Sequence, residues 1–385
     1  MTSCNLNSST MPNRLPRLNL SVFTMVVTNS IASRASRVSG TSGAFRLLDR
    51  RSGKGVALIK NLAVAGLALI LCGFTAATPD PAQVQIVTTD VDHFWQAFDD
   101  AGKVPMAQRA AIYAKEYYRA GSPGLQDFIP GRLWSPGGFA AYVEHHRDFY
   151  YKVRPHIKQV LAQKPAIEAA FERLKALYPD IKFPTHVYFV VGRSNSGGIS
   201  SDNGMILAAE MFATPPGMAY SYAGLKPDMV PFYVLHETVH LNQASLPRQG
   251  FPLLQDVVTE GTADFIASLA LPEPAERQYA DRWQYGCLHE TALAKQFLKD
   301  QDLKRTAPWM YSFKPFTGWP PDMGYWIGYR IDQAYYTKAQ DKTAALRSML
   351  AVKDFKGYLK ASGYPAAAAS CAPEKPSGQD DIKPR

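Results

Sequence analysis

The sequence predicts an α+β fold that is mainly helical and contains one small sheet. Apolar residues recur at helical spacing across 91–118 and 141–178, with breaks expected near Gly102 and at Pro155. Two short runs rich in β-branched and aromatic residues, 186–191 and 205–210, predict neighbouring strands. Two further helices are expected at 229–244 and 253–271, and these contain most of the polar residues considered below.

The composition is that of a folded, soluble chain. The protein has 385 residues, of which 46% are hydrophobic and 19% charged, with a mean hydropathy of −0.19. This balance excludes a fully disordered chain and a multi-span membrane protein. The net charge of +9 comes almost entirely from the first 78 residues, which hold nine of the 42 Lys and Arg residues but one of the 33 Asp and Glu residues. The remainder is nearly neutral, so no nucleic-acid partner is expected.

The N-terminal segment predicts export. Residues 1–55 are rich in Ser, Asn, Arg and Gly, which predicts either a disordered extension or a translation start placed too early. Residues 56–77 are predicted as a signal peptide, because the apolar run 62–74 is too short to span a bilayer comfortably and is followed by small residues. A periplasmic or secreted protein is therefore expected. Lipidation of Cys72, at the end of the apolar run, is an alternative that would tether the chain to a membrane.

One domain is expected after the leader. Residues 78–365 have globular composition without a long linker or an internal repeat, and residues 366–385 are predicted to form a flexible tail. Cys287 and Cys371 are the cysteines outside the leader, and in an exported protein they could form one disulfide. The sequence leaves that pairing open.

The helix predicted at 229–244 carries an HExxH motif, His236-Glu237-Thr238-Val239-His240. Histidines four residues apart lie on the same face of a helix, about 5–6 Å apart at Cβ, and both imidazoles can reach one zinc ion. The residues before the motif are apolar, so the helix is expected to be buried, and buried polar side chains need partners. A pair of hydrogen-bonded core histidines without metal is the alternative.

A catalytic zinc requires a third protein ligand. The metzincin continuation is absent, because Gln243 and Leu246 stand where its glycine and third histidine would be. Glu260 follows His240 by 20 positions on the next predicted helix, and Asp264 lies one turn further on the same face.

This arrangement resembles the gluzincin clan of metallopeptidases, in which an HExxH helix is followed by a helix bearing ExxxD. The resemblance implies a zincin-like fold with the small sheet beside the HExxH helix. It also implies Zn²⁺ as cofactor, Glu260 as third ligand, and Asp264 as the acceptor of a hydrogen bond from His236. A carboxylate in that place would fix the tautomer of the imidazole.

Six segments carry a narrower resemblance that covers most of residues 90–335. They are FWQAFD, GSPGLQDFI, VGRSNSGGIS, HETVHLNQ, EGTADFIA and GYWIGYRI. Together they are similar to a family of predicted zinc-dependent proteases of unknown function.

These residues predict zinc-dependent hydrolysis of a peptide or protein substrate. Glu237 is expected to act as general base on the zinc-activated water and to pass the proton to the leaving amine. The oxyanion needs a donor, for which Tyr325, Tyr329 and Arg330 are candidates, with His289 less favoured. The strand at 205–210 is expected to offer its edge to an extended peptide.

Two other functions are open at this point. The protein could be an exported or lipid-anchored binding or assembly protein that retains a zincin fold without peptidase activity, or a hydrolase of a non-peptide amide. Glu237 argues for activity, because a structural zinc does not need a general base. The sequence leaves the oligomeric state open.

Overall fold

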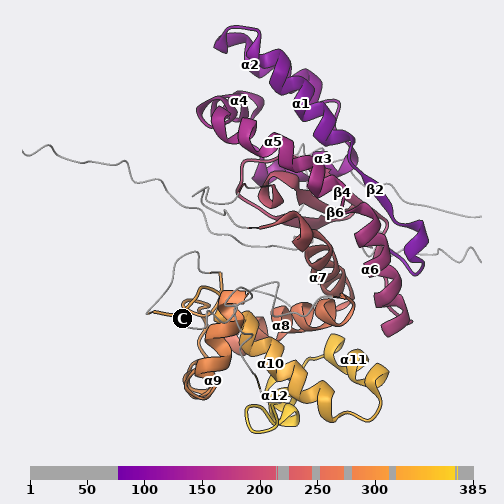
Figure 1. Ribbon diagram of the computed structural model, residues 1–385, viewed down its shortest axis with the longest axis vertical. Coiled ribbons are helices and arrows are strands. Elements are labelled where there is room, and N and C mark those ends of the chain that lie inside the picture. The colour runs from indigo at the N-terminus through magenta and orange to yellow at the C-terminus, as the bar shows by residue number, and fades with distance from the viewer. Residues whose placement is uncertain are drawn as a thin grey trace, which may run out of the picture.

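Figure 1 shows a computed structural model of the chain, which describes residues 77–213, 215, 225–244, 252–272, 280–311, 318–368 and 371. The predicted extension, the apolar run with Cys72, and most of the predicted tail lie outside these residues. Within the described part, no helix combines the length and apolar character needed to cross a membrane. The predicted α+β class is confirmed: the chain is mostly helical and contains a small sheet.

The sheet has four strands in the order β2-β4-β6-β5. The strands are β2 (Gln85–Val87), β4 (His186–Val190), β5 (Gly198–Ser201) and β6 (Gly204–Ala208). β2, β4 and β6 are parallel, and β5 is antiparallel to β6. A separate two-stranded ladder pairs β1 (Ala77–Thr78) with β3 (Phe183–Pro184).

The two predicted strands pair with each other as expected, but the prediction of a free edge at 205–210 is wrong. β6 lies between β4 and β5 and is hydrogen-bonded on both sides. It also ends at Ala208, where a 3₁₀ helix, η3 (Ala209–Phe212), begins. Among the described strands of this sheet, the one at the edge on this side is β5.

Helices make up most of the N-terminal half (Figure 1). They are α1 (Thr89–Gly102), α2 (Met106–Tyr113), η2 (Ala114–Tyr118), α3 (Pro123–Arg132), α4 (Pro136–His145), α5 (Arg147–Leu161) and α6 (Lys164–Leu177). The predicted break near Gly102 is confirmed, because α1 ends there. The predicted break at Pro155 is wrong: α5 continues through it.

The core of this half is aromatic. Phe94 contacts the rings of Phe98, Tyr117 and Tyr150, and all four side chains are fully buried. Tyr117 and Tyr150 also donate hydrogen bonds to the carbonyls of Val191 and Gly192, just after β4. Buried hydroxyls need such partners, and these contacts tie the loop after the sheet to the helical core.

The C-terminal half is helical. It contains η4 (Pro227–Met229), α7 (Val230–Asn242), α8 (Leu253–Leu269), α9 (Ala280–Asp300), α10 (Met323–Lys338), α11 (Lys342–Leu350) and α12 (Phe355–Ser362). One further short helix, the 3₁₀ helix η1 (Pro81–Gln83), belongs to the N-terminal half and precedes β2. The helices predicted at 229–244 and 253–271 correspond to α7 and α8. In Figure 1, α7 runs from the sheet toward α8, which lies beside α10.

Cys287 and Cys371 form a disulfide across 84 residues of chain, so α9 is linked covalently to the segment after α12. Closing a loop of this length restricts the unfolded chain and typically stabilises a protein by about 2–4 kcal/mol. Disulfides persist in oxidising compartments, which agrees with the predicted export.

Candidate metal centre

The HExxH residues lie on the buried face of α7. The helix starts with Val230 and Pro231, where the missing N–H of proline has no intrahelical partner to lose. Apolar side chains such as Val234 and Leu235 are fully buried around the motif. His236 and Glu237 are 4% and 1% exposed, so these polar groups must find their partners inside the protein.

Three ligand-type atoms from α7 and α8 converge. Nε2 of His236 lies 2.9 Å from Nε2 of His240, and Oε2 of Glu260 lies 3.2 Å and 3.1 Å from these two nitrogens. These residues form a His-His-Glu group of a kind that could hold a metal ion. The two helices therefore bring together the three residues expected as ligands.

Each imidazole is oriented by a second residue. Nδ1 of His236 lies 2.8 Å from Oδ1 of Asp264. Nδ1 of His240 lies 2.7 Å from Oε1 of Gln243, whose amide nitrogen donates to the carbonyl of Thr259. Both partners present an oxygen, so both Nδ1 atoms carry the proton and donate. Both Nε2 atoms of the neutral rings consequently present lone pairs to the centre.

This arrangement fits a cation. Two nitrogen lone pairs and a carboxylate oxygen repel one another unless a positive charge lies among them. Zinc binds such atoms at about 2.0–2.2 Å in a tetrahedron, which separates them by about 3.3–3.6 Å, close to the separations of 2.9–3.2 Å found here. A proton on one imidazole is the alternative cation.

In the absence of a metal, His236 and Glu260 shift each other's pKa. Burial by itself lowers the pKa of His236, but the hydrogen bonds and charges of Asp264 and Glu260 raise it to about 10. Burial likewise raises the pKa of Glu260, and the two histidines lower it well below its ordinary value. The site therefore favours a positive charge at its centre and an ionised carboxylate.

Glu237 contributes a carboxylate oxygen without a partner. Its Oε1 is buried and accepts no hydrogen bond from the described protein atoms. A buried, unsatisfied carboxylate oxygen is costly, and native proteins keep such groups chiefly where a water, ion or reaction needs them. This observation fits the predicted general base, which remains a prediction.

Two tyrosines approach the cluster. Tyr311 donates a hydrogen bond from its hydroxyl to Oε1 of Glu260 at 3.2 Å. The Tyr325 ring is stacked near that of His236, with centroids 6.3 Å apart, and burial raises the pKa of its hydroxyl well above the ordinary value. Tyr325 is thus a neutral donor near a ligand and remains the best placed of the predicted oxyanion donors.

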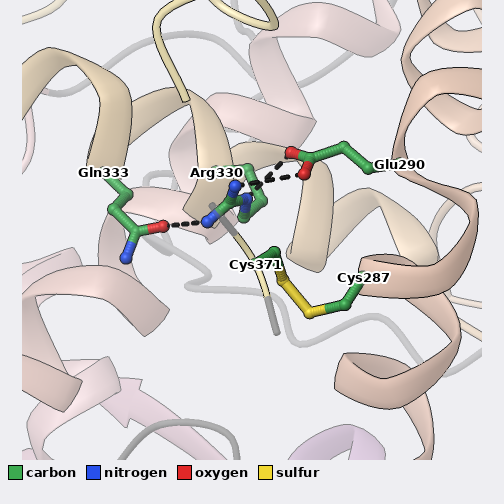
Figure 2. Close-up of a disulfide and its surroundings, with 5 residues drawn as sticks. All are labelled: Cys287, Glu290, Arg330, Gln333 and Cys371. Carbon is green, nitrogen blue, oxygen red and sulfur yellow. Dashed lines mark hydrogen bonds and ion pairs between the residues drawn. A yellow bond between two sulfur atoms is a disulfide. The ribbon is translucent and has the colours of Figure 1, made fainter. Parts of the chain in front are cut away.

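The described contacts of the other predicted donors are with residues other than the three ligands. The Tyr329 hydroxyl forms a hydrogen bond with the hydroxyl of Ser268 at 3.2 Å. The guanidinium of Arg330 is buried, pairs with Glu290 at 2.9 Å, and hydrogen-bonds Gln333, beside the disulfide (Figure 2). His289 is at a kink in α9 with its ring against Tyr285. The contacts described for Arg330 and His289 are with residues other than the three ligands.

A small cavity lies beside Asp264. Its volume is about 20 Å³, and it is lined by Phe232, Asp264, Arg282, Trp283, Tyr325, Trp326 and Tyr329. One water molecule needs roughly 10–15 Å³ measured in this way. The cavity can therefore hold a water, but it is too small for a peptide side chain.

Sequence reasoning missed Gln243 and Tyr311. Gln243 departs from the metzincin motif, but its place three residues after His240 puts it within reach of that imidazole. Tyr311 lies 51 residues after Glu260 in a loop between α9 and α10, and no spacing rule connects the two. A short local spacing could have indicated Gln243; only the fold reveals Tyr311.

Comparison with known proteins gives one family. No curated protein and no solved structure matches the chain. Residues 78–366 match the family model described as gliding motility protein GldB, which covers most of the chain and none of the predicted extension. Because the match covers well over half of the chain, the chain belongs to the gliding motility protein GldB family.

Proposed function

We propose that the protein binds zinc through His236, His240 and Glu260 and that this centre hydrolyses peptide bonds. Support comes chiefly from one observation: two imidazole nitrogens and a carboxylate oxygen converge on one point, next in sequence to the buried Glu237, whose Oε1 accepts no hydrogen bond from the described residues. The same proposal includes that residues 78–365 form one domain and that this domain has a zincin-like fold.

Each residue of the site would have a separate role in peptide hydrolysis. Zinc, when bound, would polarise a substrate carbonyl and lower the pKa of water. Glu237 takes the proton of the attacking water and passes it to the leaving amine. Asp264 and Gln243 keep the imidazoles in the tautomer that leaves Nε2 available. Tyr325 is the proposed donor to the developing oxyanion.

The cellular location of the protein is inferred from its family. The family is one of lipoproteins, so the chain is an exported protein, as the leader predicts, and it has a membrane anchor, which the sequence leaves as an alternative. Attachment through Cys72 stays a prediction, because that residue lies outside the described part of the chain.

A second function has specific support: an exported, lipid-anchored binding or assembly protein in which zinc is structural. The family match favours this role over peptide hydrolysis, since its description names a motility protein. The burial of the ligand side chains, which are only 3–5% exposed, also suits a structural ion. In that role the partners are other proteins of a membrane-associated assembly.

The Glu237→Gln variant distinguishes the two functions. Purified wild type is expected to contain one zinc per chain by mass spectrometry and to cleave members of a mixed peptide library. Glu237→Gln is expected to retain zinc and lose at least 100-fold in cleavage rate, because the base is missing. Cleavage unchanged in this variant would rule out the mechanism. Wild type that holds zinc and cleaves no peptide would support the assembly role.

Removal of the metal provides the control. Dialysis against a chelator is expected to abolish cleavage and to lower the melting temperature, because zinc binds the folded chain. Readdition of zinc should restore both. A wild-type protein that contains no zinc and gains no stability from it would contradict both functions.

A further inference from the structure

Tyr311 is the contact of Glu260 that the proposed function does not use. Its hydroxyl donates to Oε1 of Glu260, whereas Oε2 of the same carboxylate faces the two Nε2 atoms. The two oxygens of one carboxylate are thus used differently. A hydrogen bond to one oxygen restricts rotation of the carboxylate and fixes which oxygen faces the imidazoles.

The backbone at Tyr311 is in an unusual conformation. Its φ is +57°, in the left-handed region that bulky residues rarely adopt. The preceding residues hold it there: Trp309 and Met310 are buried, the amide of Met310 donates to Thr306, and the amide of Gly324 donates to Trp309. Such strain persists where the surroundings over-determine it, and it is concentrated at functional sites.

The three candidate ligands form a consistent set. His236 is oriented by Asp264, His240 by Gln243, and Glu260 by Tyr311. Asp264 lies on α8 together with Glu260, and Gln243 caps the C-terminal end of α7, which carries both histidines. Tyr311 comes from a different part of the chain, the loop that joins α9 to α10.

We propose that Tyr311 is a positioning residue for Glu260, which turns Oε2 toward the imidazoles and thereby sets the affinity of the metal centre. The proposal rests on zinc binding but not on peptide hydrolysis. It assigns a role in metal binding to the α9–α10 loop: the strained backbone presents one hydroxyl to one ligand oxygen. Tyr311 itself acts through Glu260.

The alternative is that Tyr311 only fills space. It packs against the hydrophobic core, and its ring is perpendicular to that of Tyr325 with centroids 6.3 Å apart. These contacts belong to the ring. Replacement by phenylalanine keeps the ring and removes the hydroxyl, so the two roles give different results.

The test compares Tyr311→Phe with Tyr118→Phe in the full mature chain. Tyr118 is a matched control, because its hydroxyl also donates to one oxygen, the carbonyl of Trp134, but lies on η2 in the N-terminal half. Zinc Kd is measured by competition with a fluorescent chelator, the visible spectrum is recorded with cobalt in place of zinc, and the melting temperature of the metal-free protein is determined.

Tyr311→Phe is expected to weaken zinc binding by about 10–100-fold, the usual effect of losing a residue that orients a ligand. The cobalt spectrum should change, since it reports the ligand geometry, whereas the melting temperature of the metal-free protein should stay near that of wild type. Tyr118→Phe should leave zinc affinity and the cobalt spectrum unchanged.

An unchanged Kd and cobalt spectrum in Tyr311→Phe would overturn this role while leaving zinc binding intact. A fall in zinc affinity that is equally large in Tyr118→Phe would also overturn it, because the effect would then follow general destabilisation. If wild type binds no zinc, the proposed function fails together with this inference, and that result is recognised from wild type alone.

Discussion

Helix α8 meets its two main neighbours in opposite ways. Toward α7 it extends the carboxylate side chains of Glu260 and Asp264, which contact the imidazoles. Where it approaches α10 most closely, neither helix has a side chain: Gly261 meets Gly328, and a Cβ built on Gly328 would lie 1.9 Å from the carbonyl oxygen of Val257.

The difference shows how one helix serves chemistry and packing within one turn. Gly261 directly follows the candidate ligand Glu260, so the contact with α10 sets the position of the backbone that carries the ligand. Gly261 in mid-helix costs roughly 1 kcal/mol relative to alanine. The close approach of the two helices explains why that cost is tolerated.

The largest expected effect lies on the α10 side. Gly328→Ala should destabilise the protein by about 3 kcal/mol or more, because the new Cβ meets backbone atoms of α8 and the helices must separate. Gly137→Ala is the control, since a Cβ there has nothing within 4 Å; it should change stability by about 1 kcal/mol or less. Urea denaturation of the metal-free proteins measures both.

The zinc affinity of the same variants tests whether the contact with α10 also positions Glu260. If the α10 contact positions Glu260, the folded fraction of Gly328→Ala should also bind zinc more weakly, whereas Gly137→Ala should not. Equal stability of Gly328→Ala and Gly137→Ala would show that the two helices can separate without cost, which would contradict the packing argument.

The next effect lies on the α7 side. Asp264→Ala should weaken zinc binding by about 100-fold and Gln243→Ala by about 10-fold, within the range typical of residues that orient metal ligands. The charged acceptor is expected to matter more, because hydrogen bonds to ionised groups are roughly twice as strong as neutral ones. Chelator competition gives both Kd values. A larger loss in Gln243→Ala would reverse this ranking.

The sequence predicts the candidate metal ligands, but it does not predict all the residues that contact them. Helical spacing places His236 beside His240 and Glu260 beside Asp264, and the resemblance to gluzincins assigns the two pairs to one centre. Tyr311 could not be found in this way, because it reaches Glu260 through a loop whose path depends on the packing of Trp309 and Met310.

Two errors in the fold have physical causes. Pro155 was expected to break a helix, but it lies on an exposed side of α5, where the carbonyl left without an N–H partner can bind water. β5 was overlooked because the sequence Gly-Ile-Ser-Ser lacks a strand-like alternation, and without it β6 seemed to be an edge. In both cases the surroundings of the segment, solvent at Pro155 and the adjacent strand at β5, decided its structure, and its local sequence pattern did not.

The smallest expected effect concerns Tyr329, which lies on α10 and was a candidate oxyanion donor. Its hydroxyl forms a hydrogen bond with the hydroxyl of Ser268 on α8, and its ring packs against Phe265 and Trp283. Tyr329→Phe should cost about 1 kcal/mol in unfolding free energy and leave zinc affinity unchanged. Any peptidase kcat should change less than twofold, whereas losing an oxyanion donor costs about 100–1000-fold. A loss of that size would move Tyr329 from the packing side of α8 to the chemical side, and the division between the two sides would no longer hold.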